Sequence, residues 1–148
     1  MPFVDGRRRD LAAMIAPLQR ALVAAEQPVL RAHGLSMWGY VVLDTVEGQP
    51  VRTQAALAEF IGADKSRIIG VLDELENDGL LERTRDPADR RARLVTITEE
   101  GRRRHGAVQA EIQRGEERLL AQLPAADREA LLRSLAALVD ALPKLGQD

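Results

Sequence analysis

The sequence predicts a mainly α-helical protein with one small β-hairpin, and three observations support this fold class. Long segments repeat apolar residues at helical spacing, and residues that begin and end helices punctuate them. One short segment has the composition of two strands around a turn. The 148 residues fit one domain, and a content of 45% hydrophobic and 30% charged residues is typical of a globular chain. Since only 3% are aromatic, aliphatic side chains must fill the core.

The first predicted helix spans Asp10 to His33. The apolar residues that recur in it at helical spacing are Leu11, Ile15, Leu18, Leu22 and Val29. Pro17 and Pro28 lie inside the segment, and each removes a backbone donor, so we expect a kink or break at one of them. After Gly34, Ser36 is placed to cap a second, short helix.

Two short helices and a tight turn follow a loop at 48–50. The first helix, Gln54 to Ile61, has Thr53 as its cap, and the second, Lys65 to Asn77, has Asp64. The turn between them contains Gly62. Two short helices joined in this way are typical of a helix-turn-helix.

The next segment predicts a β-hairpin. Leu80–Arg85 and Arg93–Ile97 have strand composition. Between them, Asp86-Pro87-Ala88-Asp89 has the residues of a type I turn, which leaves Arg90 and Arg91 at the tip. A two-stranded hairpin is marginal alone and must pack on the preceding helices. The arrangement is a wing, so residues 50–98 are predicted to form a winged helix-turn-helix lobe.

Long helices are predicted on both sides of this lobe. Thr98 caps the helical section that follows the wing, and Pro124 interrupts it. Its apolar stripes comprise Val108, Ile112, Leu119, Leu123, Leu131, Leu135, Leu138 and Leu142. Such broad apolar faces require a partner, and the candidates are the first helix and an identical second chain. Residues 1–148 are thus one predicted domain, in which 8–33 and 99–146 form a helical dimerisation region.

The distribution of charge is compatible with a nucleic-acid partner although the formal net charge is −2, but taken alone a charge run is more often a solvated face. Residues 83–104 contain eight arginines against four acidic residues, a local net charge of +4. Screening limits the reach of distant charges to roughly 10 Å. A locally basic strip on an acidic body can therefore dock on phosphates.

Several classes of protein are excluded or disfavoured. The absence of cysteine excludes disulfides, thiol catalysis and cysteine-ligated zinc. His33 and His105 are far apart in sequence, and no nucleophile motif or glycine-rich phosphate loop accompanies them. We therefore predict no catalytic residue, no metal site, no cofactor and no enzyme activity. No segment has the apolar length of a signal peptide or a membrane span, which favours a cytoplasmic protein without a membrane partner.

Four segments together resemble the MarR (multiple-antibiotic-resistance regulator) family. They are LAEFIGADKSR at 57–67, LDELENDGL at 72–80, RTRDPADRRAR at 83–93 and LVTITEEG at 94–101. The likeness spans nearly the whole chain, and the wing segment is its most specific part. The resemblance implies a homodimeric repressor with intertwined terminal helices, a palindromic double-stranded DNA operator, and release by a small ligand.

The recognition helix and the wing supply the predicted DNA contacts. Arg67 could grip a guanine through two hydrogen bonds. Arg91 or Arg90 would enter the minor groove, and Asp89 would steer that arginine through an ion pair. The predicted DNA-binding residues are Asp64, Lys65, Ser66, Arg67, Ile69, Gly70, Arg85, Asp89, Arg90, Arg91 and Arg93.

Ile69 and Gly70 depart from the family, which often has polar or basic residues there. Ile69 could touch a thymine methyl group and Gly70 could allow close approach of the helix, or both could be poor base readers. This pair and the acidic net charge leave room for a protein-interaction module without specific DNA binding. A transcriptional activator or a metal-responsive regulator on the same fold is a further alternative.

An effector pocket is predicted at His33, Met37, Trp38 and Tyr40. The indole of Trp38 offers a flat apolar wall and an N–H donor, which suits aromatic acids or phenols. A single tryptophan in an amphipathic helix, however, usually belongs to the core.

Overall fold

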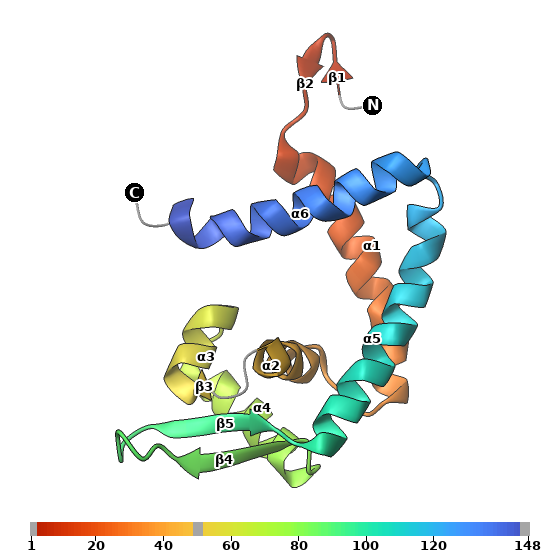
Figure 1. The fold of residues 1–148 in the computed structure, drawn as a ribbon. Coiled ribbons are helices and arrows are strands. Elements are labelled where there is room, and N and C mark those ends of the chain that lie inside the picture. Colours follow the sequence, from red (N-terminus) through yellow and green to blue (C-terminus); the bar gives the residue numbers. More distant parts are fainter. Residues whose placement is uncertain (1–2, 49–51, 146–148) are drawn as a thin grey trace. The chain divides into compact units, whose positions relative to one another are not determined.

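The computed structural model describes residues 3–48 and 52–145 and confirms the predicted fold class. The elements in chain order are β1 (Phe3–Val4), β2 (Arg7–Arg8), α1 (Leu11–Ala32), α2 (Met37–Gly48), β3 (Arg52–Thr53), α3 (Gln54–Ile61), α4 (Lys65–Asn77), β4 (Leu81–Arg85), β5 (Arg93–Ile97), α5 (Glu99–Leu120) and α6 (Ala125–Leu145) (Figure 1). They form two compact units, Met1–Ile112 and Gln113–Asp148. Of the loop predicted at 48–50, Gly48 ends α2 and the other two positions lie outside the described residues.

Helix α1 runs through both of its prolines, so the predicted break is absent. Pro17 and Pro28 are eleven residues apart, which places them on nearly the same face of the helix. Both are exposed, as are Ala13 and Ala24, whose carbonyls lose their helical partner. Water can satisfy these carbonyls, and the helix continues. In the described ranges, no helix combines the length and the apolar character that a bilayer crossing requires.

The four predicted helix caps are confirmed, and that of Thr98 on the Gly101 N–H, at 3.0 Å, begins α5. The side chains of Ser36, Thr53 and Asp64 each accept a hydrogen bond from the backbone N–H three residues later, at 2.9, 3.2 and 2.8 Å. Helices α3 and α4 consequently begin and end at the predicted residues. Between them Gly62 has a φ of 72°, a left-handed conformation that a residue without Cβ adopts readily.

The wing belongs to a three-stranded antiparallel sheet in the order β3-β5-β4. Strands β4 and β5 pair from Leu81↔Ile97 at one end to Arg85↔Arg93 at the other. Strand β3 was not predicted. It pairs with β5 at Thr53↔Leu94, a contact that two residues of sequence do not signal. The sheet therefore links the start of α3 directly to the wing.

The tip of the wing turns three residues later than predicted. The hydrogen bond that closes a four-residue turn runs from the N–H of Ala92 to the carbonyl of Asp89, at 3.0 Å. The carboxylate of Asp86 instead accepts the backbone N–H two residues on, at 2.9 Å. This local bond competes with the predicted turn. Arg90 and Arg91 still lie at the tip, as the two central residues of the observed turn.

The hydrophobic core of the first unit lies among α2, α3, α4, the wing strands and the first half of α5. Its fully buried large residues include Leu30, Val42, Leu43, Val46, Leu57, Ile68, Leu72, Leu80, Leu81, Val95 and Val108. By contrast, α6 exposes Leu131, Leu132, Leu135, Leu138, Val139 and Leu142, and α1 exposes Leu11, Ile15, Leu18 and Val23. The predicted apolar stripes are therefore uncovered along α6 and along much of α1. On α5, by contrast, Val108 and Ile112 are buried in the core of the first unit, so this part of the predicted stripe needs no second chain.

Arg83 on β4 ties the wing to both helices of the helix-turn-helix. Its Nε donates to Oε2 of Glu76 at 3.2 Å and its backbone N–H donates to the same oxygen at 3.1 Å. Its terminal nitrogens donate to Asp73 and to Gln54, so one guanidinium bonds to residues of α4 and α3. We call these four residues the Arg83 cluster. The hydrogen bond from Arg83 holds the pKa of Glu76 below its ordinary value, and the same bond raises the pKa of Arg83.

The exit from the wing depends on a close approach at Gly101. Thr98 accepts the Gly101 N–H at 3.0 Å and donates its hydroxyl to the carbonyl of Gly79 at 2.7 Å. This bonding presses the first turn of α5 onto the backbone after α4. A Cβ on Gly101 would lie 2.2 Å from the carbonyl oxygen of Leu80 and 2.8 Å from Cγ1 of Ile97.

The substitution Gly101→Ala should therefore destabilise the protein. The carbonyl of Leu80 already accepts the Thr98 N–H and cannot move without loss of that bond. We expect a loss of about 1–3 kcal/mol in the free energy of unfolding, measured by urea denaturation. Gly106→Ala on the same helix is the control, because no atom lies within 4 Å of its added Cβ. It should gain about 0.5–1 kcal/mol, and equal effects of the two variants would contradict the close approach.

The Arg83 cluster predicts a specific pH dependence of stability. Since the pKa of Glu76 is lowered in the folded state, its pairing stabilises the fold above the ordinary value of 4.5 and is lost as the pH falls through the folded value. Glu76→Gln should be less stable than the wild type at pH 7, and the difference should shrink below about pH 4.5. Thermal unfolding across this range tests the expectation, with Glu74→Gln on the same helix as the charge-matched control. A difference that persisted unchanged at pH 3 would refute it.

Candidate nucleic-acid interface

The first turn of α4 presents three exposed polar side chains, Lys65, Ser66 and Arg67. The preceding residue, Asp64, is engaged as the cap. The backbone N–H of Arg67 donates to its carboxylate and lowers the pKa of Asp64, so the carboxylate stays charged at the helix N-terminus. Of the four residues predicted to contact DNA here, Asp64 thus fixes the backbone of the turn, and the other three are accessible.

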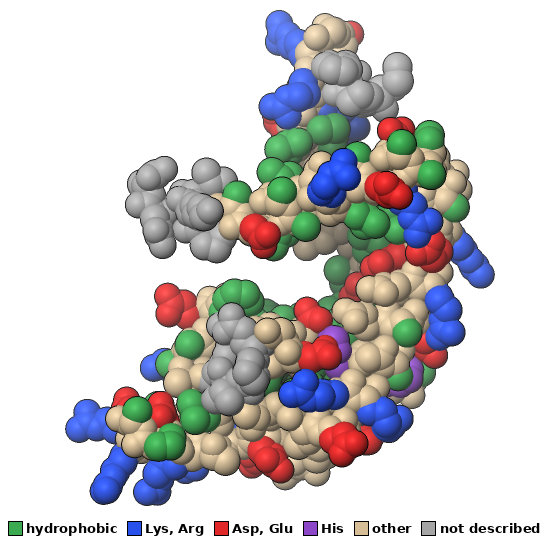
Figure 2. All heavy atoms as spheres, in the orientation of Figure 1, with side chains coloured by type: hydrophobic (Ala, Val, Ile, Leu, Met, Phe, Trp, Pro, Cys, Tyr) green, Lys and Arg blue, Asp and Glu red, His purple; other side chains and the backbone are tan. Residues whose placement is uncertain are grey.

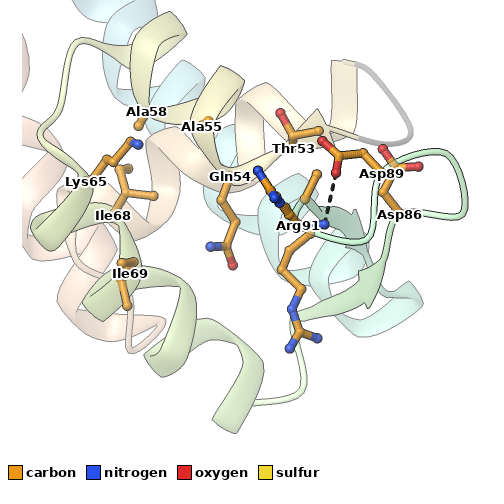
Figure 3. A pocket seen from close by; sticks show the side chains of 12 residues that line it. Thr53, Gln54, Ala55, Ala58, Lys65, Ile68, Ile69, Asp86, Asp89 and Arg91 are labelled. Carbon is orange, nitrogen blue, oxygen red and sulfur yellow. Dashed lines mark hydrogen bonds between the residues drawn. The ribbon is translucent and has the colours of Figure 1, made fainter.

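Arginines crowd the wing. Arg85, Arg90, Arg91 and Arg93 are all exposed, and basic side chains gather at the wing end of the face shown in Figure 2. Asp89 holds the loop by accepting the backbone N–H of Arg91 at 3.0 Å, the dashed line in Figure 3. This bond is to the backbone of Arg91 rather than to its guanidinium, which leaves the predicted side-chain ion pair as a prediction.

The recognition helix and the wing border a common cavity of about 460 Å³ (Figure 3). Its lining residues are Thr53, Gln54, Ala55, Ala58, Lys65, Ile68, Ile69, Asp86, Asp89, Arg91, Ala92 and Arg93. Much of this lining is aliphatic. Cations border the cavity from both elements, Lys65 on α4 and Arg91 and Arg93 on the wing, beside the carboxylates of Asp86 and Asp89. Helix and wing therefore present their positive charge around one hollow.

Ile69 and Gly70 lie on the exposed side of α4. The side chain of Ile69 is 46% exposed and lines the cavity. Nothing lies within 4 Å of a Cβ built on Gly70, so this position is open. Both residues are accessible to a ligand on this face. Because neither residue has a side chain that can form a hydrogen bond, any hydrogen bond to a ligand at this point must come from neighbouring residues.

Arg67 is held in an unexpected way. Its Cζ lies 5.7 Å from the ring centroid of Trp38 on α2, in the geometry of a cation–π contact. The structure thus brings together a residue predicted to read DNA and a residue predicted to line an effector pocket. Sequence reasoning treated them as members of separate sites.

The other predicted effector residues contact different parts of the first unit. His33 Nε2 lies 3.4 Å from a carboxylate oxygen of Glu111 on α5. Tyr40 stacks on His105, also on α5, with ring centroids 5.3 Å apart, and Met37 packs against the core. None of the four predicted residues lines the 460 Å³ cavity.

His105 is a buried residue whose role sequence reasoning missed. Its side chain is 2% exposed, and its Nε2 lies 2.8 Å from Oδ1 of Asp44. Its Nδ1 lies 2.5 Å from Oε2 of Glu47. Asp44 and Glu47 are three residues apart on α2 and thus share a face, which is the only local signal of this arrangement. The imidazole joins α2 to α5 inside the first unit.

Three consecutive arginines near the start of α5, residues 102–104, are partly neutralised. Arg103 and Arg104 both lie near Glu100, and the hydrogen bond from Arg103 lowers the pKa of that carboxyl. Of the triplet, Arg102 is an exposed cation outside these pairs. As for metals, no group of three or more histidine or acidic residues suited to an ion occurs in the part of the chain that the structure describes.

Comparison with known proteins gives consistent results. Residues 35–92 match the MarR family. A protein of Thauera aromatica named as a transcriptional regulatory protein for the hcr operon is 29% identical over 119 residues, which cover 78% of this chain and 72% of the relative. A MarR-family transcriptional regulator from Rhodococcus sp. RHA1 has a TM-score of 0.74 at 30% identity, and the match covers 88% of this chain and 95% of that one.

A second similar protein, CouR, has been solved in two complexes. CouR from Rhodococcus jostii RHA1 bound to p-coumaroyl-CoA has a TM-score of 0.74 at 29% identity, with 90% of this chain and 91% of that chain covered. The repressor CouR bound to a 23-mer DNA duplex has a TM-score of 0.75 at 28% identity, with 88% and 92% covered. The chain therefore belongs to the MarR family, whose members are transcriptional regulators that bind DNA as dimers.

Proposed function

We propose that the protein is a homodimeric repressor that binds a palindromic operator and leaves it when a small aromatic or phenolic ligand binds. One observation carries the DNA contact. The exposed first turn of α4 and the exposed wing arginines border the same cavity, so a single duplex can meet both. Because its target is an operator in DNA, the protein would act in the cytoplasm, as a regulator rather than as an enzyme.

The contacts divide by groove. The first turn of α4 enters the major groove, where Lys65 and Ser66 reach phosphates or base edges and Ile69 meets a thymine methyl group. Arg90 or Arg91, the central residues of the wing turn, enters the adjacent minor groove, where a guanidinium is favoured by the negative potential. Arg85 and Arg93 lie opposite each other on β4 and β5, at the end of the two strands next to the wing loop, and contact phosphates.

The apolar faces of α1 and α6 support the dimer. On α6, Leu138, Val139 and Leu142 are 59%, 62% and 61% exposed, which is unusual for large aliphatic side chains in contiguous turns. A second copy of the chain covers these faces and places two lobes on the two halves of a palindrome. Residues 8–33 and 99–146 remain the proposed dimerisation region, and 50–98 the DNA-binding lobe.

The ligand class is supported by residue chemistry and by a relative. Trp38 and Tyr40 on α2, with His33 nearby in sequence, give aromatic and titratable groups suited to a planar acid. CouR, of similar fold, has been solved both with p-coumaroyl-CoA and with DNA. A ligand that binds only the DNA-free conformation releases the operator by mass action.

Replacement of both wing-tip arginines by alanine should abolish tight operator binding. The double variant Arg90→Ala/Arg91→Ala removes the minor-groove cation and its neighbour, and each lost phosphate contact reduces the log–log salt slope by about 0.9. We expect at least a tenfold rise in Kd by fluorescence anisotropy, on the duplex that the wild-type chain selects from a randomised pool.

The matched control for the wing variant removes the same charge elsewhere. Arg31→Ala/Arg102→Ala acts at exposed positions on α1 and α5. It should leave Kd within about threefold and the salt slope nearly unchanged, since exposed distant charges are screened. If both double variants weakened binding equally, net charge rather than the wing would determine affinity.

The proposed ligand response predicts release of bound DNA by planar aromatic acids. Benzoates, cinnamates and p-coumaroyl-CoA are titrated into the preformed complex, and at least one should raise the operator Kd tenfold or more, because it stabilises a conformation that does not bind DNA. Cyclohexanecarboxylate has the same charge without the aromatic ring and should have little effect. A panel with no active member would show that the ligand class is wrong.

A further inference from the structure

We infer that Trp38 is a positioning residue for DNA recognition, which acts by holding the guanidinium of Arg67. The starting observation is the contact between α2 and the first turn of α4, where Arg67 Cζ lies 5.7 Å from the indole centroid. The inference rests on the proposed DNA-binding function and names a residue outside the DNA-binding lobe's recognition helix and wing.

The backbone brings the two side chains together. Gly39 follows Trp38 on α2, and a Cβ built there would lie 3.4 Å from a methyl group of Leu75 on α4. This distance is an ordinary van der Waals contact, so α2 and α4 lie side by side at this point, while the nearest atom to the added Cβ is Oγ of Ser36 at 3.1 Å. The Gly39 N–H also donates to the hydroxyl of Ser36, which fixes the first turn of α2. Trp38 is thereby set beside the start of the recognition helix.

Arg67 is fixed at its other end as well. Its backbone N–H donates to Asp64 at 2.8 Å, so its Cα belongs to a capped turn. With the backbone capped and the guanidinium on the indole, the long side chain between them has few conformations left. Arg67 is nevertheless exposed, whereas Trp38 is half-buried. The indole can occupy one face of the planar guanidinium, while the N–H groups at the edge of the guanidinium donate to a phosphate or to a guanine.

This arrangement lowers the cost of binding DNA. A free arginine loses conformational freedom when it is immobilised at an interface, and this loss weakens binding. An arginine that already lies over an aromatic ring has lost part of this freedom on folding, so it loses less when it binds DNA. Removal of the ring should therefore weaken DNA binding even though Trp38 need not touch DNA.

A double-mutant cycle on the full chain tests this inference. Trp38→Leu, Arg67→Ala and the combined variant are compared by anisotropy on the duplex selected by the wild type. We expect Trp38→Leu to raise Kd about 3- to 30-fold, in line with the range of cation–π contacts. It should have little further effect in the Arg67→Ala background, because the two residues act as a unit. Trp38→Phe keeps a ring and should restore binding to within about threefold.

A structural role of Trp38 alone would give a different result. Met37→Ala alters a neighbouring half-buried residue that packs on the core but makes no stack with Arg67, so it reports the effect of a lost core contact. Thermal unfolding of each variant shows which of them fold. If Met37→Ala and Trp38→Leu weakened binding alike, or if Trp38→Leu and Arg67→Ala were additive, the inference would be overturned.

Fluorescence supplies an independent readout, because Trp38 is the single tryptophan of the chain. Arg67→Ala should change its emission, and Arg67→Lys should change it less, since lysine keeps the charge but not the planar stack. Identical spectra for the wild type and Arg67→Ala would show that Arg67 does not contact Trp38 in solution. If the wild type selected no duplex, both the proposed function and the inference would fail. If Arg67→Ala weakened binding and Trp38→Leu did not, the inference alone would fail.

Discussion

The Arg83 cluster is the contact on which the relation between recognition helix and wing depends. Apolar burial of Leu80, Leu81 and Val95 supplies most of the free energy that attaches the hairpin to the helices. Such contacts are not directional, and a two-stranded hairpin is marginal alone. The guanidinium of Arg83 adds direction, because it bonds at once to α4 and α3. A single exposed ion pair contributes little, so the role of the cluster is mainly to orient the wing.

The arginines of residues 83–104 differ in whether acidic neighbours pair with them. Arg83 is paired with Asp73 and Glu76 and ties the wing to the helices. Arg103 and Arg104 share the single carboxylate of Glu100 and are neutralised only in part, and Arg102 beside them is exposed. The wing arginines at 85, 90, 91 and 93 are exposed and border the cavity or the turn. The local charge of +4 counted along the sequence is therefore not spread evenly. Its accessible part is concentrated where the wing extends past α4, which explains how a chain of net charge −2 can present a cationic surface.

Local signals predicted the helix-turn-helix well, and long-range contacts account for what was missed. Thr53 and Asp64 cap helices through bonds that span three residues, so their sequence signature is complete by itself. Strand β3 exists only because it pairs with β5, about forty positions away. The buried imidazole of His105 contacts the carboxylate of Asp44, which lies 61 positions earlier in the sequence. Of the candidate site, its DNA-facing residues were predictable by motif, whereas the stack of Arg67 on Trp38 required the packing of α2 on α4.

Helix α2 thus connects the parts of the first unit that the sequence presents as separate. Its first turn stacks on Arg67 of the recognition helix, and its middle holds His105 of α5 through Tyr40, Asp44 and Glu47. Two of the four residues predicted to bind an effector, Trp38 and Tyr40, are the aromatic members of these contacts. A planar ligand that competed for either ring would have to displace a guanidinium or an imidazole. At Trp38, a bound planar ligand and the guanidinium of Arg67 would compete for one indole ring, which would couple the proposed ligand site to the proposed DNA contact.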